Sequence, residues 1–303
     1  MQVKSEVNRK LKVNNISDKG GKNHETERSI SRKQENTDFT SVIIKRNDQA
    51  VRHPDDTLEL AILTGIEQHK RPWFSLFLSS LAAGLILGFA GMCVALTTQL
   101  FPNSENLYLN RLSIALVYPL GFIVSIISGT QLFTEHTATA LYPVLDQQEN
   151  VKSLFTLWGV VLVGNLFGTL CSSILLFLSD SMIYARNGFI EISNGLLVYA
   201  PHEIFIGAIL AGWLMAQAGW LVLASPSSTG QVLCIYIITF IIGYGGLPHS
   251  IAGASEIFSG IFHSKTPNYW GSILFVVSAA LGNLLGGTLF VGVLNYAHIK
   301  KMQ

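Results

Sequence analysis

One uncharged run of the sequence is interrupted by Gly243-Tyr244-Gly245-Gly246-Leu247-Pro248-His249-Ser250. The run covers 52 residues, 204–255, without a lysine, arginine, aspartate or glutamate, whereas one membrane-spanning helix needs about 20 apolar residues. Glycines followed by a proline favour a break in helical structure. Non-helical backbone at membrane depth is tolerated only where it is buried in protein or lines a cavity. The stretch therefore predicts a broken span, with His249 beside a cavity.

A second interruption of apolar sequence occurs at Ser128-Gly129-Thr130-Gln131-Leu132-Phe133-Thr134-Glu135-His136, after which apolar residues continue to Leu145. The motif Gly164-Asn165-Leu166 is repeated as Gly282-Asn283-Leu284, an offset of 118 residues. The same offset carries Gln131 onto His249, so we expect the two breaks to occupy equivalent places in two halves of the chain. Half-helices that restart after such breaks point free N–H groups and positive dipole ends inward, which suits an anion.

The apolar runs predict six membrane spans and therefore place both termini on the same side. The runs are 73–98, 112–133 continuing to 145, 153–179, two within 204–255 divided at 225–230, and 266–297. Lysine and arginine are more frequent near the ends that share a side with the termini, which places both termini in the cytoplasm by the positive-inside rule. We expect a multi-pass protein of the inner cell membrane.

A duplication explains the two breaks. Ala83-Gly84 and Ala90-Gly91 in the first span have counterparts at Ala211-Gly212 and Ala218-Gly219 in the fourth, in the same order as the Gly-Asn motifs. Small residues are common in membrane helices, and each match alone is weak. Because each copy holds three spans, the copies must have opposite orientations, and inverted repeats of this kind form transport pathways at their shared interface. The fold class expected is an all-α membrane protein of two inverted three-helix repeats, with the second and fifth helices broken.

The first 72 residues hold 14 of the 20 lysines and arginines, and the net charge is +1. This distribution excludes a soluble enzyme of uniform composition, and the small net charge argues against nucleic acid as a partner. Residues 1–57 are predicted to be a disordered polar cytoplasmic tail. Residues 58–71 have helical apolar spacing and are interpreted as an amphipathic surface helix, although they could also extend the first span. Residues 73–297 form the predicted transport domain.

The quoted motifs resemble those of the formate/nitrite transporter family. The matching segments are 128–134, 164–166, 208–212, 248–252 and 282–287. The resemblance implies a homopentamer of aquaporin-like protomers in the lipid bilayer, each with its own pore for a small monovalent anion such as formate or nitrite. Glycines of the Gly-Asn motifs are expected to allow close helix contact. The usual lysine before the fourth span would fall near Leu196 and is absent, and a less characterised subgroup is the better match.

The resemblance also implies the residues of the substrate pathway. The family's central pore histidine falls on His249 and its loop threonine on Thr134. Its apolar constrictions fall on Tyr118, Phe122, Leu132 and Ile242. Gln131, which the repeat offset pairs with His249, completes the predicted pathway.

His249, Glu135 and Glu256 are ionisable residues within predicted spans, where such side chains are usually functional. The imidazole, with an ordinary pKa of about 6.5, can donate to an anion or pass a proton to a weak acid. A buried carboxylate is costly unless it is paired, so Glu135 is expected to be hydrogen-bonded near its break, with His136 as a possible partner. We interpret the two glutamates as a possible proton or ion relay; the residues equally allow a structural role.

The function predicted is transport of small monovalent anions, either as a channel or coupled to protons. A neutral-solute channel of the aquaporin or urea type is an alternative, but neither break contains an Asn-Pro-Ala box. A second alternative is a membrane-anchored scaffold that acts through the 1–72 tail. An enzyme is not expected, because no nucleophile and base are suitably arranged, and neither a metal nor a cofactor is predicted.

Overall fold

The computed structural model describes residues 51–101 and 106–300, and within these ranges the secondary structure is entirely helical. The elements of the first half are α4 (Pro54–Lys70), α5 (Trp73–Leu100), α6 (Leu107–Val117), α7 (Pro119–Ile127), α8 (Thr137–Leu145), α9 (Val151–Leu178) and α10 (Asp180–Ile183). Those of the second half are α11 (Arg186–Leu196), α12 (Pro201–Ala224), α13 (Ser228–Gly245), α14 (Ser250–His263), α15 (Tyr269–Gly287), the π-helix η1 (Thr288–Val293) and α16 (Leu294–Lys300).

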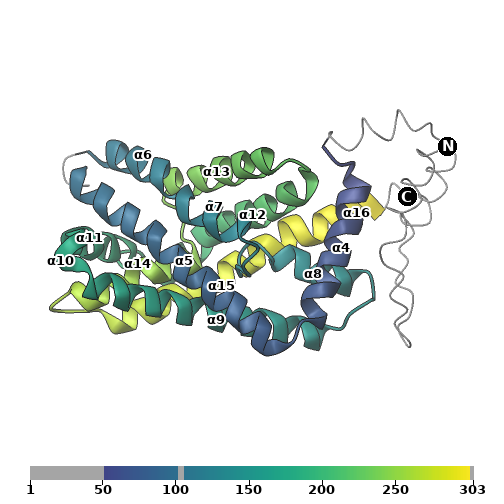
Figure 1. Cartoon of the computed structure of the whole chain (residues 1–303), viewed down its shortest axis with the longest axis horizontal. Coiled ribbons are helices and arrows are strands. Elements are labelled where there is room, and N and C mark those ends of the chain that lie inside the picture. Colours follow the sequence, from purple (N-terminus) through teal and green to yellow (C-terminus); the bar gives the residue numbers. More distant parts are fainter. Residues whose placement is uncertain (1–50, 102–105, 301–303) are drawn as a thin grey trace, which may run out of the picture. The chain divides into compact units, whose positions relative to one another are not determined.

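Six helical segments in the described residues are long and apolar enough to cross a membrane, which confirms the predicted number of spans. They are Trp73–Leu100, Leu107–Ile127, Val151–Leu178, Pro201–Ala224, Ser228–Gly245 and Tyr269–Lys300. The two short helices α8 and α14 follow the second and fifth spans and are the predicted half-helices. In Figure 1 the spans lie along the long axis, and α4 crosses one end of them, which we call the α4 end.

Each half of the chain is built around one extensive helix crossing. In the first half α5 packs against α9, and in the second half α12 packs against α15. In the first crossing, a Cβ atom on Gly84 would collide with the carbonyl of Asn165. In the second, a Cβ atom on Gly212 would collide with the carbonyl of Asn283. Only glycine permits this backbone approach. The equivalence of the two crossings confirms the predicted repeat. Gly84 and Gly212 allow close contact between helices of the same chain.

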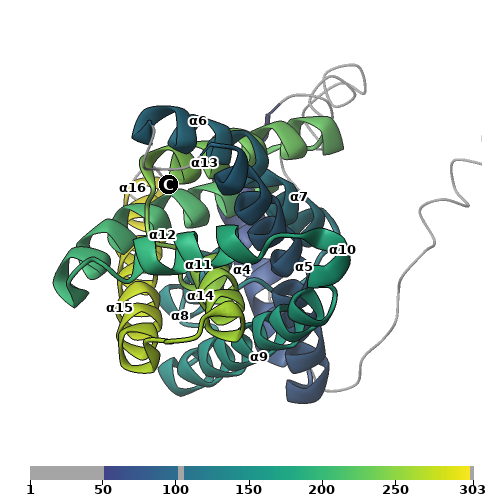
Figure 2. The same cartoon turned by 90° about the vertical axis from the view of Figure 1, so that its left-hand side faces the viewer.

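Figure 2 shows the second view of the same bundle, in which α14 lies between α9 and α15. The contacts that α14 makes with α9 and α15 agree with that placement. The other half-helix, α8, packs against α4 at the α4 end of the bundle. The two half-helices therefore enter the bundle from opposite ends, as inverted repeats require.

The helix predicted over 58–71 begins earlier and is packed differently from the expectation. It starts at Pro54, and proline is well suited to the first turn of a helix. The negative charges of Asp55 and Asp56 in the same turn interact favourably with the positive end of the helix dipole. Residues 54–57 are therefore helical and not tail, while residues 1–50 lie outside the described residues. The helix ends before the extended residue Arg71, so it does not continue the first span.

The apolar face of α4 is buried against the chain itself. A cluster of buried side chains joins α4 to α8, α12, η1 and α16; its members are Leu58, Ala61, Ile62, Ile66, Ala138, Tyr142, Ala216, Val291 and Ile299. The segment before α4 is also fixed, because the backbone N–H of Arg52 donates to the carbonyl of Ala224 at 2.9 Å. The helix thus covers the α4 end of the spans.

Candidate functional site

Each break is held by one buried asparagine. The side chain of Asn165 accepts from the backbone N–H of Phe133 (2.8 Å) and donates to the carbonyls of Ser80 (2.7 Å) and Gln131 (2.8 Å). Backbone groups freed from a helix in a membrane must find partners inside the protein, because lipid offers none. Asn165 supplies these partners to the first break and ties it to α5.

The second break has the same arrangement. Asn283 accepts from the N–H of Ser250 (2.8 Å) and donates to the carbonyls of Ala208 (2.8 Å) and Pro248 (3.2 Å). The asparagines therefore pair Gln131 with Pro248, and the residue equivalent to His249 is Leu132. The predicted pairing of Gln131 with His249 was wrong by one residue.

His249 lies at the start of α14 and contacts the first break. Its Nε2 atom is 2.8 Å from Oγ1 of Thr134, and the exposed fractions of the two residues are 2% and 0%. The backbone N–H of Ala252 donates to Nδ1 of His249 at 3.2 Å, so Nδ1 carries no proton in this arrangement. A neutral imidazole then donates from Nε2 to Thr134. The hydroxyl proton of Thr134 is consequently left for another acceptor.

Aromatic and aliphatic side chains surround this pair. The rings of Phe122 and His249 meet edge to face with centroids 5.0 Å apart, and Tyr118 is 5.1 Å from Phe122. Phe122, Leu132 and Ile242 are fully buried. The structure therefore brings Thr134, His249, Phe122 and Tyr118 together where the two breaks meet.

A cavity of about 160 Å³ leads to His249 from the end opposite α4. Tyr118 and Ile242 line it together with Leu196, the position near which the family's lysine was expected. The lining also holds polar and charged side chains, and His249 lies among them with an exposed fraction of 2%.

Arg111 lines the same cavity and was missed by sequence reasoning as a pathway residue. It lies on α6, and its guanidinium is close to the break, because a Cβ atom on Gly246 would lie 3.6 Å from its Nη2. Gly246 has a φ of +60°, a conformation that favours glycine. The sequence carried one signal: Arg111, Ile114 and Tyr118 have the i, i+3, i+7 spacing of one helix face, and all three line the cavity.

The two glutamates occupy different environments. Glu256 lines the cavity and is 6% exposed. Glu135 packs against Gly219 of α12 and is not among the lining residues. Its Oε2 is 3.7 Å from Nδ1 of His136, and within the described part of the chain that oxygen accepts no hydrogen bond. Glu135 was predicted to be hydrogen-bonded near the break, with His136 as a partner; the proximity to His136 is found, at a distance longer than a hydrogen bond.

Gln131, also predicted to belong to the pathway, does not line the cavity. Its backbone N–H donates to Oγ of Ser79 (3.2 Å), and its carbonyl accepts from Asn165. Its side-chain oxygen is buried without a hydrogen-bond partner among the described residues. In this structure its backbone stabilises the break.

Comparison with known proteins agrees with this geometry. Residues 55–297 match the family model described as formate/nitrite transporter. An inner membrane protein of Escherichia coli (strain K12), YfdC, is 30% identical over 242 residues, covering 78% of this chain and 76% of the relative.

Two solved structures share the fold. One, described as an FNT family ion channel, has a TM-score of 0.73 at 20% identity and covers 81% of this chain and 99% of its own. The other, a pentameric formate channel with formate bound, has a TM-score of 0.65 at 21% identity and covers 76% and 98%. The broken helices, their paired asparagines and the match over 55–297 lead to one conclusion: this chain is a multi-pass membrane protein that belongs to the formate/nitrite transporter family.

Proposed function

We propose that the chain forms a pore for small monovalent anions of the formate and nitrite class, with His249 and Thr134 at its centre. The observation that carries the proposal is the 2.8 Å contact between these two residues at the meeting point of the breaks. Because Nε2 of His249 donates to Oγ1, the hydroxyl of Thr134 is available to donate to a passing anion. A hydrogen bond to a charged group contributes about 1.5–3 kcal/mol, which offsets part of the lost hydration.

Arg111 and Glu256 set the charge of the cavity in this proposal. The guanidinium attracts anions into the cavity, while an ionised Glu256 repels them. Protonation of Glu256 removes that repulsion, so anion passage accompanied by a proton is favoured over passage of the anion alone. Glu256, rather than Glu135, is the proposed proton carrier because it faces the cavity.

The proposed assembly is a homopentamer in which each protomer has its own pore. The solved formate channel that shares the fold is described as pentameric, and this chain resembles the same family in its motifs. The α4 end is proposed to be cytoplasmic. Lys70, Arg71 and Lys152 lie at that end, as the positive-inside rule favours.

The proposal is tested by formate and nitrite uptake into proteoliposomes containing wild type or His249→Phe. The phenyl ring keeps the aromatic packing against Phe122 but cannot donate to Thr134. We expect loss of uptake in a variant that elutes as a pentamer like wild type. Uptake by His249→Phe at the wild-type rate would contradict the proposed centre, and a stable monomer would contradict the assembly.

A further inference from the structure

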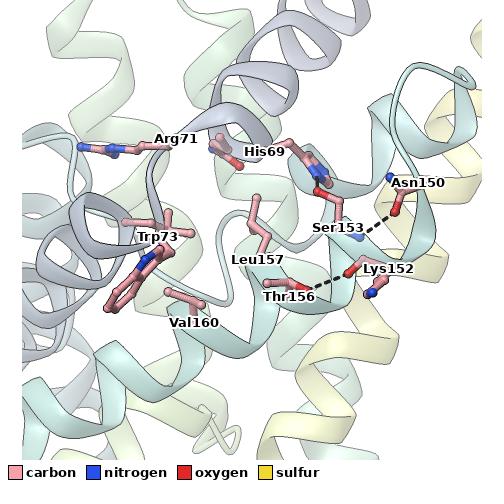
Figure 3. A pocket seen from close by; sticks show the side chains of 11 residues that line it. His69, Arg71, Trp73, Asn150, Lys152, Ser153, Thr156, Leu157 and Val160 are labelled. Atoms are coloured by element: carbon pink, nitrogen blue, oxygen red, sulfur yellow. Dashed lines mark hydrogen bonds between the residues drawn. The ribbon is translucent and has the colours of Figure 1, made fainter.

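A separate cavity of about 310 Å³ lies at the α4 end, between the end of α4 and the beginnings of α5 and α9. It is remote in the fold from the cavity at His249, and the two have no lining residue in common. Eleven residues line the cavity. Figure 3 shows the cavity from close by.

The lining divides into a polar and an apolar part at the level where two spans begin. Polar side chains come from the end of α4 and the first turn of α9, next to Trp73, the first residue of α5. Leu76, Leu157 and Val160 lie farther along the spans. Tryptophan is enriched where a bilayer meets water. The cavity thus has a polar part at the ends of the spans, where lipid headgroups are expected, and an apolar part toward the middle of the spans.

The charge of the lining is positive and uncompensated. Arg71 and Lys152 are exposed, and no acidic residue lines the cavity. In Figure 3 these two residues lie on opposite sides of the cavity, with Leu157 between them, and the guanidinium of Arg71 extends outward. Neither side chain forms an ion pair with a described residue. Two cations without a counter-ion select an anionic ligand.

One wall of the cavity is fixed and carries an unused acceptor. The ring of His69 contacts Oγ of Ser153 through Nδ1 (2.7 Å) and donates from Nε2 to the carbonyl of Ala140 (2.9 Å), which ties α4 to α8 and α9. Beside it, Gln68 is 4% exposed and its Oε1 atom has no hydrogen-bond partner among the described residues. A buried amide oxygen without a partner is costly, and because Gln68 lines the cavity, a turn of this amide toward a ligand that brings a hydroxyl donor would satisfy it.

We propose that this cavity binds the headgroup of an anionic phospholipid that carries hydroxyl groups, of the phosphatidylglycerol type. The phosphate pairs with Lys152 and with Arg71, whose exposed side chain turns inward to meet it, a headgroup hydroxyl donates to Gln68, and the acyl chains pass Trp73 and Val160 into the bilayer. Basic cavities between membrane helices bind acidic headgroups in this manner. A volume near 300 Å³ is at the lower end for small-ligand sites and holds a headgroup, not a whole lipid.

The test uses native mass spectrometry of the delipidated full-length protein titrated with phosphatidylglycerol, phosphatidic acid and phosphatidylcholine. The variants are Arg71→Gln/Lys152→Gln and Gln68→Leu, and Lys265→Gln, an exposed cation at the opposite end, is the control. Each basic residue near a bilayer contributes about fivefold to binding of an acidic lipid, so the double variant should bind phosphatidylglycerol about 25-fold more weakly. Lys265→Gln should bind like wild type.

Gln68→Leu tests the hydroxyl contact separately from the charge. Wild type should prefer phosphatidylglycerol over phosphatidic acid, which lacks headgroup hydroxyls, and the leucine variant should lose that preference. Equal binding of phosphatidylcholine, or unchanged binding in the double variant, would overturn the proposal. Displacement of the lipid by glycerol 3-phosphate at equal concentration would identify a soluble phosphate as the ligand. Dissociation of the oligomer in the double variant with unchanged lipid binding would make these residues a subunit contact.

Discussion

Replacement of Thr134 by valine isolates the hydroxyl that the proposed mechanism assigns to the anion. Valine keeps the shape of the side chain, which is fully buried, and removes only the oxygen 2.8 Å from Nε2 of His249. The Nε2 proton of His249 then points at the valine methyl group that replaces the oxygen, and the imidazole cannot turn this proton toward the anion, because Nδ1 is held by the N–H of Ala252. A permeating anion therefore loses a hydrogen bond of about 1.5–3 kcal/mol, which corresponds to about 10- to 150-fold slower formate flux.

The same substitution leaves the Nε2 proton of His249 unpaired in a buried position, at a cost of about 1–3 kcal/mol in stability. Thr134→Ser retains the hydroxyl and should conduct like wild type. Thr169→Val is the matched control, because Thr169 is equally buried but donates to the carbonyl of Leu166 in its own helix. The assay is stopped-flow formate uptake into proteoliposomes, normalised to incorporated protein. Flux by Thr134→Val within threefold of wild type would show that the Thr134 hydroxyl does not bind the anion.

Three further predictions concern the cavity and the breaks. Arg111→Gln should raise the half-saturating formate concentration about fivefold with little change in maximal flux, because an attraction of about 1 kcal/mol is lost at the mouth; an unchanged value would remove Arg111 from the pathway. Glu256→Gln should conduct at high pH as wild type does at low pH, because wild-type flux falls as the carboxyl ionises. Glu135→Gln, in the same assay, should retain the wild-type pH profile, and an equal effect of both variants would contradict the separate roles. Asn165→Leu should lower stability by about 2–4 kcal/mol, since three buried hydrogen bonds are lost, and thermal unfolding in detergent would measure it.

Much of the fold was predictable because lipid restricts the possible structures. The uncharged runs fixed the six spans, and the Gly-Asn motifs identified the two helix crossings. The predicted pairing of residues between the two breaks was wrong by one position. The offset of 118 residues was taken from the Gly-Asn motifs, which lie in the third and sixth spans and not in the breaks. The two breaks differ in length, with Ile127 and Thr137 flanking one and Gly245 and Ser250 the other. Only the hydrogen bonds of the asparagines reveal the register.

The remaining errors concern directions that apolar patterning does not encode. The apolar face of α4 could be buried equally well in lipid or in protein, and the structure places it against α8 and α12. Glu135 and Glu256 are similar in sequence context, but the rotation of each residue about its helix or loop decides which one reaches the cavity. Arg111 lay just outside the predicted second span, which began at residue 112, whereas α6 begins at Leu107 and therefore contains Arg111.

If the pathway through His249 selects small anions, stopped-flow uptake into proteoliposomes must distinguish formate and nitrite from water and urea. Formate and nitrite should enter faster than in protein-free vesicles, and an inward proton gradient should accelerate both. Water and urea should show no increase. Urea or water uptake that exceeds anion uptake, or anion uptake equal to that of empty vesicles, would contradict the selection of anions by this pathway.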